Sequence, residues 1–264
     1  MLDRVRGRRK HNRTNAETFR FEEQANREPI MIRRLLVPPR EEVHCWLVNL
    51  DESAEISNAL ALLSPDERER SHRFRFDRDR GRFIQSRAAL RTLLGQYLDV
   101  APQNLRFEYN PEGKPSLKNA PALCFNLSHS ATFAAIAVGG APVGVDIECL
   151  REVDVNIAEK YFSPDEASSI ARLPLESQQE AFFRVWTRKE ALVKALGVGL
   201  GLALDSFSVS LDDDAVLLRL NHAEEGIEEW TLLNLEAGPG ICGAIAVRSQ
   251  TAKLCFMQTL DLNQ

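Results

Sequence analysis

The chain has 264 residues, of which 44% are hydrophobic and 27% are charged, a composition that is typical of globular proteins and too apolar for an intrinsically disordered one. Its net charge of −5 is unevenly distributed, because residues 1–40 carry 11 Lys and Arg against 5 Asp and Glu, whereas residues 41–264 carry 22 against 33. The acidic body argues against general nucleic-acid binding, although it leaves room for a local basic pocket that holds phosphate.

Residues 1–40 are predicted to form a flexible basic extension. They contain the basic run Arg6 to Lys10 and show little apolar periodicity. Met31 stands just before the first plausible strand, so one hypothesis is that translation starts there. The alternative is a basic arm that contacts nucleic acid or a membrane.

The remaining chain repeats itself with an offset of about one hundred residues. Three segments recur in the same order: 48–51 as 145–148, 64–67 as 163–166, and 82–95 as 184–197. Because order and spacing are both kept, the sequence predicts an α+β fold, built as a pseudo-twofold tandem of two similar α+β halves, residues 41–142 and 143–264.

Helix starts and strands can be placed within each half. The segment Ser-Pro-Asp-Glu, at 64–67 and again at 163–166, predicts a helix start in which serine caps the helix, proline opens it and glutamate completes a capping box. A long amphipathic helix follows each segment, and its apolar stripe is expected to pack on a sheet. Strands are expected at 45–50, 105–109, 133–138, 143–148, 207–210, 216–220, 230–235 and 241–247.

The two halves differ in the charged residues that the repeat places at equivalent positions. The repeat aligns Asp146, Glu190 and Lys194 of the second half with Asn49, Ala88 and Thr92 of the first. We therefore expect the second half to carry the chemistry and the first half to serve as scaffold.

Three carboxylates of the second half are candidate metal ligands. Asp146 and Glu148 lie two residues apart on a predicted strand, so they share one face about 6.6 Å apart. Glu190 and Lys194 are neighbours on one face of a helix. If that helix packs over the strand, the three carboxylates can meet at one cation, and oxygen ligands without histidine or thiolate favour magnesium. The alternative, carboxylates facing water beside a surface ion pair, stays open.

Two short motifs of the first half can contact phosphate. Residues 125–130 place His129 between two hydroxyls just after a short apolar strand, at a corner that can present donors to phosphate oxygens. A structural histidine is the alternative, and the nearby sequence supplies no serine and acid arranged as a hydrolase triad. The turn Gly113-Lys114-Pro115 offers a lysine as a flexible point charge.

Cysteine usage and hydropathy favour a cytoplasmic protein without a membrane span. The five cysteines are scattered, and no two have the spacing of a zinc ribbon or a redox motif. The longest uncharged apolar stretch, residues 133–145, is interrupted by glycine and proline and is too short to cross a bilayer. The N-terminus is charged and lacks the apolar core of a secretory signal.

Four motifs together resemble a known family in order and spacing: Gly113 to Pro115, Phe125 to Ser130, Gly144 to Glu148, and Trp186 to Lys194. The family is that of the 4′-phosphopantetheinyl transferases of the surfactin-synthetase type, and the resemblance extends from about Val43 to Val247. It implies a pseudo-dimer with the active site in the cleft between the halves. It also implies coenzyme A as donor, a serine hydroxyl of an apo acyl, polyketide or peptidyl carrier protein as acceptor, and adenosine 3′,5′-bisphosphate as product.

The resemblance further implies roles for individual residues. Asp146, Glu148 and Glu190 would hold magnesium on the pyrophosphate, with manganese as an open alternative. Glu190 and Lys194 would be catalytic, Glu190 by accepting the serine proton and Lys194 by neutralising charge. Coenzyme A would contact Arg70, Arg82, Gly113, Lys114, Pro115, Asn126, Ser128 and His129. One departure is Glu67, which stands where some relatives have a basic residue for the 3′-phosphate; Arg68 and Arg70 are candidates to replace it.

Two other functions stay open on the sequence alone. One is a magnesium-dependent hydrolase that cleaves a nucleotide pyrophosphate with the same carboxylates. The other is a non-catalytic protein that binds a nucleotide or, through its basic arm, a nucleic acid. We expect a monomer, since the chain already contains an internal pseudo-dimer, and the sequence does not identify the carrier.

Overall fold

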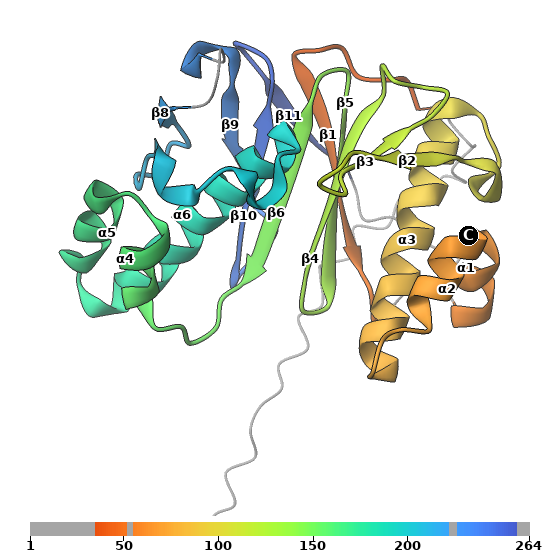
Figure 1. Cartoon of the computed structure of the whole chain (residues 1–264), viewed down its shortest axis with the longest axis horizontal. Coiled ribbons are helices and arrows are strands. Elements are labelled where there is room, and N and C mark those ends of the chain that lie inside the picture. Colours follow the sequence, from red (N-terminus) through yellow and green to blue (C-terminus); the bar gives the residue numbers. More distant parts are fainter. Residues whose placement is uncertain (1–34, 52–54, 222–225, 258–264) are drawn as a thin grey trace, which may run out of the picture. The chain divides into compact units, whose positions relative to one another are not determined.

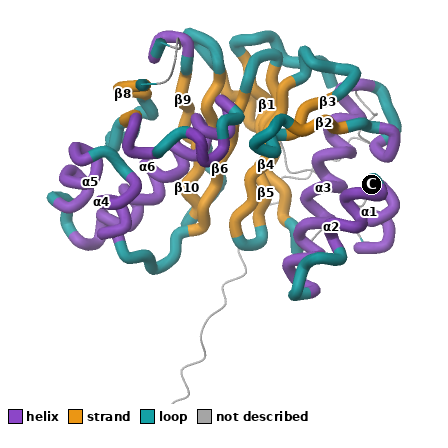
Figure 2. The backbone as a smooth tube through the Cα atoms, in the orientation of Figure 1, coloured by secondary structure: helices purple, strands orange, loops and turns teal. Residues whose placement is uncertain are grey.

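The structure, a computed structural model, describes residues 35–51, 55–221 and 226–257. Most of the predicted basic extension, and with it the hypothesis of a start at Met31, lies outside the described residues. Figure 1 labels the elements, and Figure 2 shows the same backbone coloured by helix, strand and loop.

The first half combines a four-stranded sheet with a long helix on the outer face of that sheet. Its elements are β1 (Glu42–Asn49), α1 (Ile56–Leu62), α2 (Pro65–Ser71), α3 (Asp77–Leu98), β2 (Phe107–Tyr109), β3 (Pro115–Leu117), β4 (Cys124–Ser130) and β5 (Phe133–Gly139). The sheet has the order β11-β1-β5-β4, in which β11 (Lys253–Met257) pairs in parallel with β1. The sheet of the first half therefore includes a strand from near the end of the chain.

The second half repeats this plan with a three-stranded antiparallel sheet of order β6-β10-β9 and the helix α6 on its outer face. A short ribbon, β7 with β8, packs beside α6. The elements are β6 (Val143–Cys149), α4 (Ala158–Tyr161), α5 (Pro164–Ala171), α6 (Leu175–Leu196), β7 (Phe207–Val209), β8 (Leu217–Leu220), β9 (Thr231–Asn234) and β10 (Ile241–Val247).

The two sheets pack against each other between the two long helices. Alternate side chains of β1 and β5 meet alternate side chains of β6 and β10 in a central apolar core. The opposite faces of the two sheets carry α3 and α6, each over its own apolar core, and Figure 1 shows these helices on opposite sides of the strands. Side chains alternate between the two faces of each strand, and both faces are apolar. Each sheet therefore packs against the other sheet on one face and against a helix on the other.

The predicted tandem of two α+β halves is confirmed, and so are both helix starts. Ser64 and Ser163 each open a capping box with the glutamate three residues later. Each of these glutamates also binds a buried cation on the long helix of its half: Glu67 accepts from Arg91 (2.6 Å) and Glu166 from Lys189 (2.8 Å). Glu67, the departure noted in the sequence, thus has a structural partner.

The alignment of the halves that we derived from the sequence is wrong in register. Both long helices have 22 residues, and α6 begins and ends 98 positions after α3; Arg91 and Lys189 are separated by the same 98 positions. The counterparts of Asp146, Glu190 and Lys194 are therefore Val48, Thr92 and Gln96. On the helix the error is four residues, and such a shift keeps an apolar stripe of period 3.6 almost in place, so the sequence pattern did not reveal it. On the strand the error is one residue, which moves the counterpart of Asp146 to the other face.

The predicted strands are present with small shifts at their ends. In contrast, β3 and β11 were not predicted, and β4 was expected only as a short apolar strand before His129. The position of residues 128–130 is a correction, because they lie inside β4 rather than at a corner after a strand. Every second residue of β4 is polar, so the segment does not read as a buried strand.

Candidate functional site

Gly144 lets β6 and α6 touch through their backbones. A Cβ atom on Gly144 would overlap Ala191 O and Ala195 N of α6, so only glycine fits at this crossing. The next two residues of β6 on the same face are Asp146 and Glu148, since strand side chains alternate. The close crossing brings both carboxylates under the part of α6 that carries Glu190 and Lys194.

Asp146 is the buried centre of this region. It is 5% exposed, and its Oδ1 accepts from Lys194 Nζ (2.6 Å) and from Ser128 Oγ (2.8 Å). Its Oδ2 is also buried and has no hydrogen-bond partner among the described residues. Burial raises the pKa of Asp146, while the Lys194 ammonium opposes this shift.

Glu190 lies one turn before Lys194 on α6. Within the described part of the chain its carboxylate makes no hydrogen bond or ion pair. Removal from water raises the pKa of Glu190, and the charges of Asp146 and Glu148 raise it further, against the effect of Lys194. Glu148 is held differently, because its Oε2 accepts from Ser130 Oγ (2.9 Å) and from Arg151 (2.8 Å).

The three carboxylates lie close enough for Asp146 and Glu148 to raise the pKa of Glu190, and their role as metal ligands stays a prediction. In residues 35–51, 55–221 and 226–257, no group of three His, Cys, Asp or Glu side chains is arranged to hold a metal ion. Lys194 and Arg151 instead provide the positive charge beside Asp146 and Glu148. The residues still fit a hard cation, because the buried Asp146 Oδ2 lacks a partner and the neighbouring donors are carboxylate oxygens.

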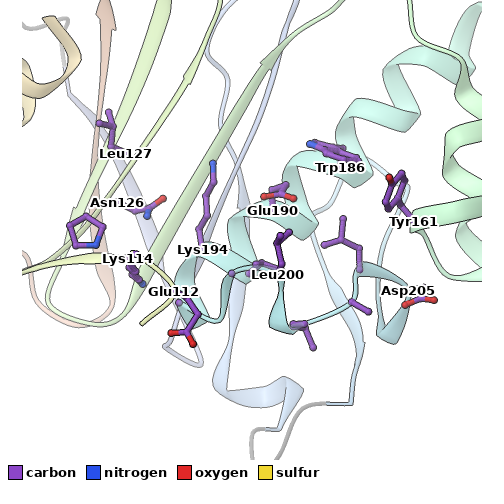
Figure 3. Close-up of a pocket in the computed structure, with 18 of the residues that line it drawn as sticks. Glu112, Lys114, Asn126, Leu127, Tyr161, Trp186, Glu190, Lys194, Leu200 and Asp205 are labelled. Carbon is purple, nitrogen blue, oxygen red and sulfur yellow. The ribbon is translucent and has the colours of Figure 1, made fainter. Parts of the chain in front are cut away.

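A cavity of about 760 Å³ opens between the two halves beside these residues. Figure 3 shows Glu190 and Lys194 on α6, with Asn126 and Leu127 of β4 across the cavity from them. Its other walls include apolar side chains, among them Tyr161, Trp186, Val193, Leu200, Leu202 and Leu204. The volume and the mixed lining are typical of small-molecule and cofactor sites.

Six of the predicted site residues line this cavity: Gly113, Lys114, Pro115, Asn126, Glu190 and Lys194. Lys114 is already engaged, because its Nζ donates to Ala195 O (2.7 Å) and Val143 O (3.3 Å). Burial lowers the pKa of Lys114 to about 8. Asn110 reinforces this contact by donating to Gly197 O (2.7 Å), so the β2–β3 turn holds the C-terminal end of α6.

The other predicted coenzyme contacts lie outside the cavity lining. Arg82 makes two hydrogen bonds to Asp51, of 2.9 and 2.8 Å, and the Arg70 guanidinium lies 5.4 Å from the Phe83 ring centre. Ser128 is buried between Asp146 and Lys194. His129 is an exposed residue of β4.

Two residues of the motifs noted in the sequence were given no role of their own: Ser130, which contacts Glu148, and Trp186, which lines the cavity. Tyr161, which also lines the cavity, was missed. Only the recurrence of Asn126, Ser128 and Ser130 at every second position signalled a polar strand face.

Comparison with known proteins identifies the family. A family model described as the 4′-phosphopantetheinyl transferase superfamily matches residues 142–246, and one described as the N-terminal part of 4′-phosphopantetheinyl transferase matches residues 51–140. The chain is 37% identical over 214 residues to the 4′-phosphopantetheinyl transferase HetI of Nostoc sp. (strain PCC 7120), covering 78% of this chain and 88% of that protein. The chain belongs to the 4′-phosphopantetheinyl transferase family.

Two Bacillus subtilis relatives support the same membership. A 4′-phosphopantetheinyl transferase is 32% identical over 206 residues, which is 75% of this chain and 92% of that protein. The 4′-phosphopantetheinyl transferase Sfp of strain 168 is 32% identical over 155 residues, or 59% of this chain and 69% of that protein. Membership makes this chain a transferase with coenzyme A as its co-substrate and carrier proteins as its acceptors.

Among the described helices, none is both long and apolar enough to span a bilayer.

Proposed function

We propose that this transferase moves the 4′-phosphopantetheine arm of coenzyme A to a serine hydroxyl of an apo carrier protein and releases adenosine 3′,5′-bisphosphate. The supporting observation is the cavity between the halves, where Glu190 and Lys194 of α6 face Asn126 of β4 beside the buried Asp146.

Asp146, Glu148 and Glu190 are the proposed ligands of a divalent cation, magnesium or manganese. The support is the unpartnered Asp146 Oδ2 and the all-oxygen donor set. When bound, such a cation supplies Lewis-acid polarisation of the pyrophosphate.

Glu190 is the proposed general base. The support is its place in the cavity, one turn before Lys194, with a carboxylate that makes no hydrogen bond or ion pair to a described residue. The serine oxygen forms a bond to the phosphorus that carries pantetheine, the serine proton passes to Glu190, and the bond from that phosphorus to the bisphosphate oxygen breaks. Lys194, whose side chain is 28% exposed, is placed to neutralise charge that builds up on the leaving group.

The coenzyme contacts divide into two groups. Gly113, Lys114, Pro115 and Asn126 line the cavity and are proposed to contact coenzyme A there. Arg70, Arg82, Ser128 and His129 are proposed on the family resemblance. For Arg82, this role requires the guanidinium to leave Asp51.

The cytoplasm remains the proposed compartment, because all five cysteines are free thiols.

Intact-mass analysis tests the proposed function. Purified protein is incubated with coenzyme A, magnesium and apo carriers of the acyl, polyketide and peptidyl classes, each beside a Ser→Ala carrier. A gain of roughly 340 Da on the serine-containing carrier, the mass of the transferred arm, is expected. Cleavage of coenzyme A without any carrier would instead support a pyrophosphate hydrolase, and an unchanged mass on every carrier contradicts the proposal.

A further inference from the structure

The contact between β4 and β6 is made by side chains rather than by backbone pairing. Each strand is the edge of its own sheet, so β6 presents backbone N–H groups that no neighbouring strand of its sheet can bind. Three side chains of β4 accept these hydrogen bonds: Asn126 from Val145 N (3.0 Å), Ser128 from Ile147 N (3.4 Å) and Ser130 from Cys149 N (3.0 Å). We call this contact the seam.

The two serines of the seam make a second bond that Asn126 does not make. Ser128 Oγ donates to Asp146 Oδ1 (2.8 Å), and Ser130 Oγ donates to Glu148 Oε2 (2.9 Å). In both cases the hydroxyl accepts from one residue of β6 and donates to the carboxylate of the residue just before it. A hydroxyl can do both at once, since it has one proton and two lone pairs.

Each serine therefore selects one oxygen of a carboxylate and leaves the other free. Asp146 Oδ1 receives Ser128 and Lys194, while the buried Oδ2 has no hydrogen-bond partner among the described residues. Glu148 Oε2 receives Ser130 and Arg151, while its Oε1 makes no hydrogen bond within the described part of the chain. The same device acts on both carboxylates of β6 that we propose as metal ligands.

We propose that Ser128 and Ser130 are positioning residues, through which the first half orients Asp146 and Glu148 of the second half for a divalent cation. This inference rests on the proposed function, since it concerns the cation that the transfer uses. Hydrogen bonds to ligating carboxylates fix their orientation, and losing such a bond typically costs 10- to 100-fold in metal affinity. The docking of the halves and the affinity for metal are thereby coupled through two hydroxyl groups.

The test measures metal binding directly. Wild type, Ser130→Ala, Ser128→Ala and Ser130→Thr are titrated with Mn²⁺, alone and with coenzyme A, and the free ion is followed by its electron paramagnetic resonance signal. We expect about 10- to 100-fold weaker binding in the two alanine variants and near wild-type binding in Ser130→Thr, which keeps the hydroxyl.

The matched control is Ser86→Ala. This serine is also buried, but its hydroxyl donates only to a backbone carbonyl of α3, that of Phe83. Its loss is expected to leave Mn²⁺ affinity unchanged, even if the melting temperature falls. Ser130 lies at the end of the seam and is only half-buried, so Ser130→Ala keeps the test decisive even if Ser128→Ala fails to fold.

Mn²⁺ binding equal to wild type in a folded Ser130→Ala variant overturns the inference, whatever happens to its melting temperature. A wild type that binds no Mn²⁺ also overturns it. The mass gain of the carrier is measured on the same samples, so transfer that persists without Mn²⁺ binding leaves the proposed transfer standing.

Discussion

The two halves use the same helix-on-strand arrangement with different side chains at the contact. In the first half, Trp46 on β1 and Tyr97 on α3 fill the space between strand and helix, and the indole donates to the tyrosine hydroxyl (3.3 Å). In the second half, the positions 98 residues later are Gly144 and Ala195, which meet through their backbones. Aromatic rings separate strand from helix in one half, and their absence lets the backbones touch in the other.

The next positions that face the long helix also differ between the halves, being apolar in the first half and acidic in the second. Val48 of β1 and Leu50, just after its end, pack into the apolar core under α3, whereas Asp146 and Glu148 occupy the equivalent positions in β6. The first half therefore gains stability from burial at the positions where the second half holds charges. The chain thus contains one framework twice, with apolar side chains at these strand positions in the first half and carboxylates in the second.

The buried ion pairs show which features belong to the framework. Both halves join a capping-box glutamate to the long helix in this way: Glu67 pairs with Arg87 and Arg91 of α3, and Glu166 pairs with Lys189 of α6. Lys189, although adjacent to Glu190 in the sequence, has its ammonium bound to Glu166, Leu204 O and Phe207 O. It is therefore a structural residue, and Lys194 is the lysine of α6 that we propose as catalytic.

The largest effect on transfer is expected when Asp146 is replaced. Asp146→Ala removes the buried carboxylate that Lys194 and Ser128 hold, so metal-dependent transfer to a carrier should be lost. Its corrected counterpart, Val48→Ala, should cost about 2 kcal/mol of unfolding free energy and leave the turnover of the folded enzyme near wild type. Steady-state rates and urea unfolding of both variants check this, and equal kinetic damage would contradict the division of roles.

The second prediction concerns Glu190, the proposed base. Glu190→Gln keeps the shape of the side chain but cannot accept the serine proton, so kcat should fall by about 10²-fold or more. The matched variant in the first half is Thr92→Ala, for which no change in kcat is expected. Rates at saturating coenzyme A and carrier measure the difference; an unchanged kcat in Glu190→Gln would rule out the base role.

The close crossing of β6 and α6 can be tested at Gly144. In Gly144→Ala the added methyl group overlaps α6 backbone atoms, so the helix must move, at a cost of about 1–3 kcal/mol of unfolding free energy. Gly201→Ala is the control, because a Cβ there meets no atom within 4 Å. Thermal and urea unfolding compare the two, and similar stabilities would show that the crossing tolerates a side chain.

The smallest expected effect concerns the link between the halves at Lys114. Its pKa of about 8, below the usual 10.5, means that the folded chain binds fewer protons than the unfolded chain between these values. Stability from this group therefore rises with pH across that window. Relative to Lys114→Met, wild type should gain stability from pH 8 to 10, whereas Lys118→Met, at an exposed ion pair, should show no such trend. Parallel pH curves for wild type and Lys114→Met would refute the assignment.

Much of the fold could be predicted because its signals are local. The capping boxes, the amphipathic helices and most strands depend on residues a few positions apart, and the internal repeat indicated two halves. The register of the repeat could not be obtained, because an apolar stripe fits nearly as well when shifted by one turn. The corrected offset depends on ion pairs such as Glu166 with Lys189, which join separate helices.

For the site, the sequence by itself determined which chemical groups are available: the Asp146 and Glu148 pair on a strand, and Glu190 with Lys194 on a helix. Only the tertiary structure decided which of these groups have partners. In the folded chain Lys194 binds Asp146, and Lys114 binds the C-terminal end of α6. The serines of β4 donate hydrogen bonds to the carboxylates of β6. Periodicity within a strand or helix fixes the face on which a side chain lies, whereas its hydrogen-bond partners depend on how distant segments pack together.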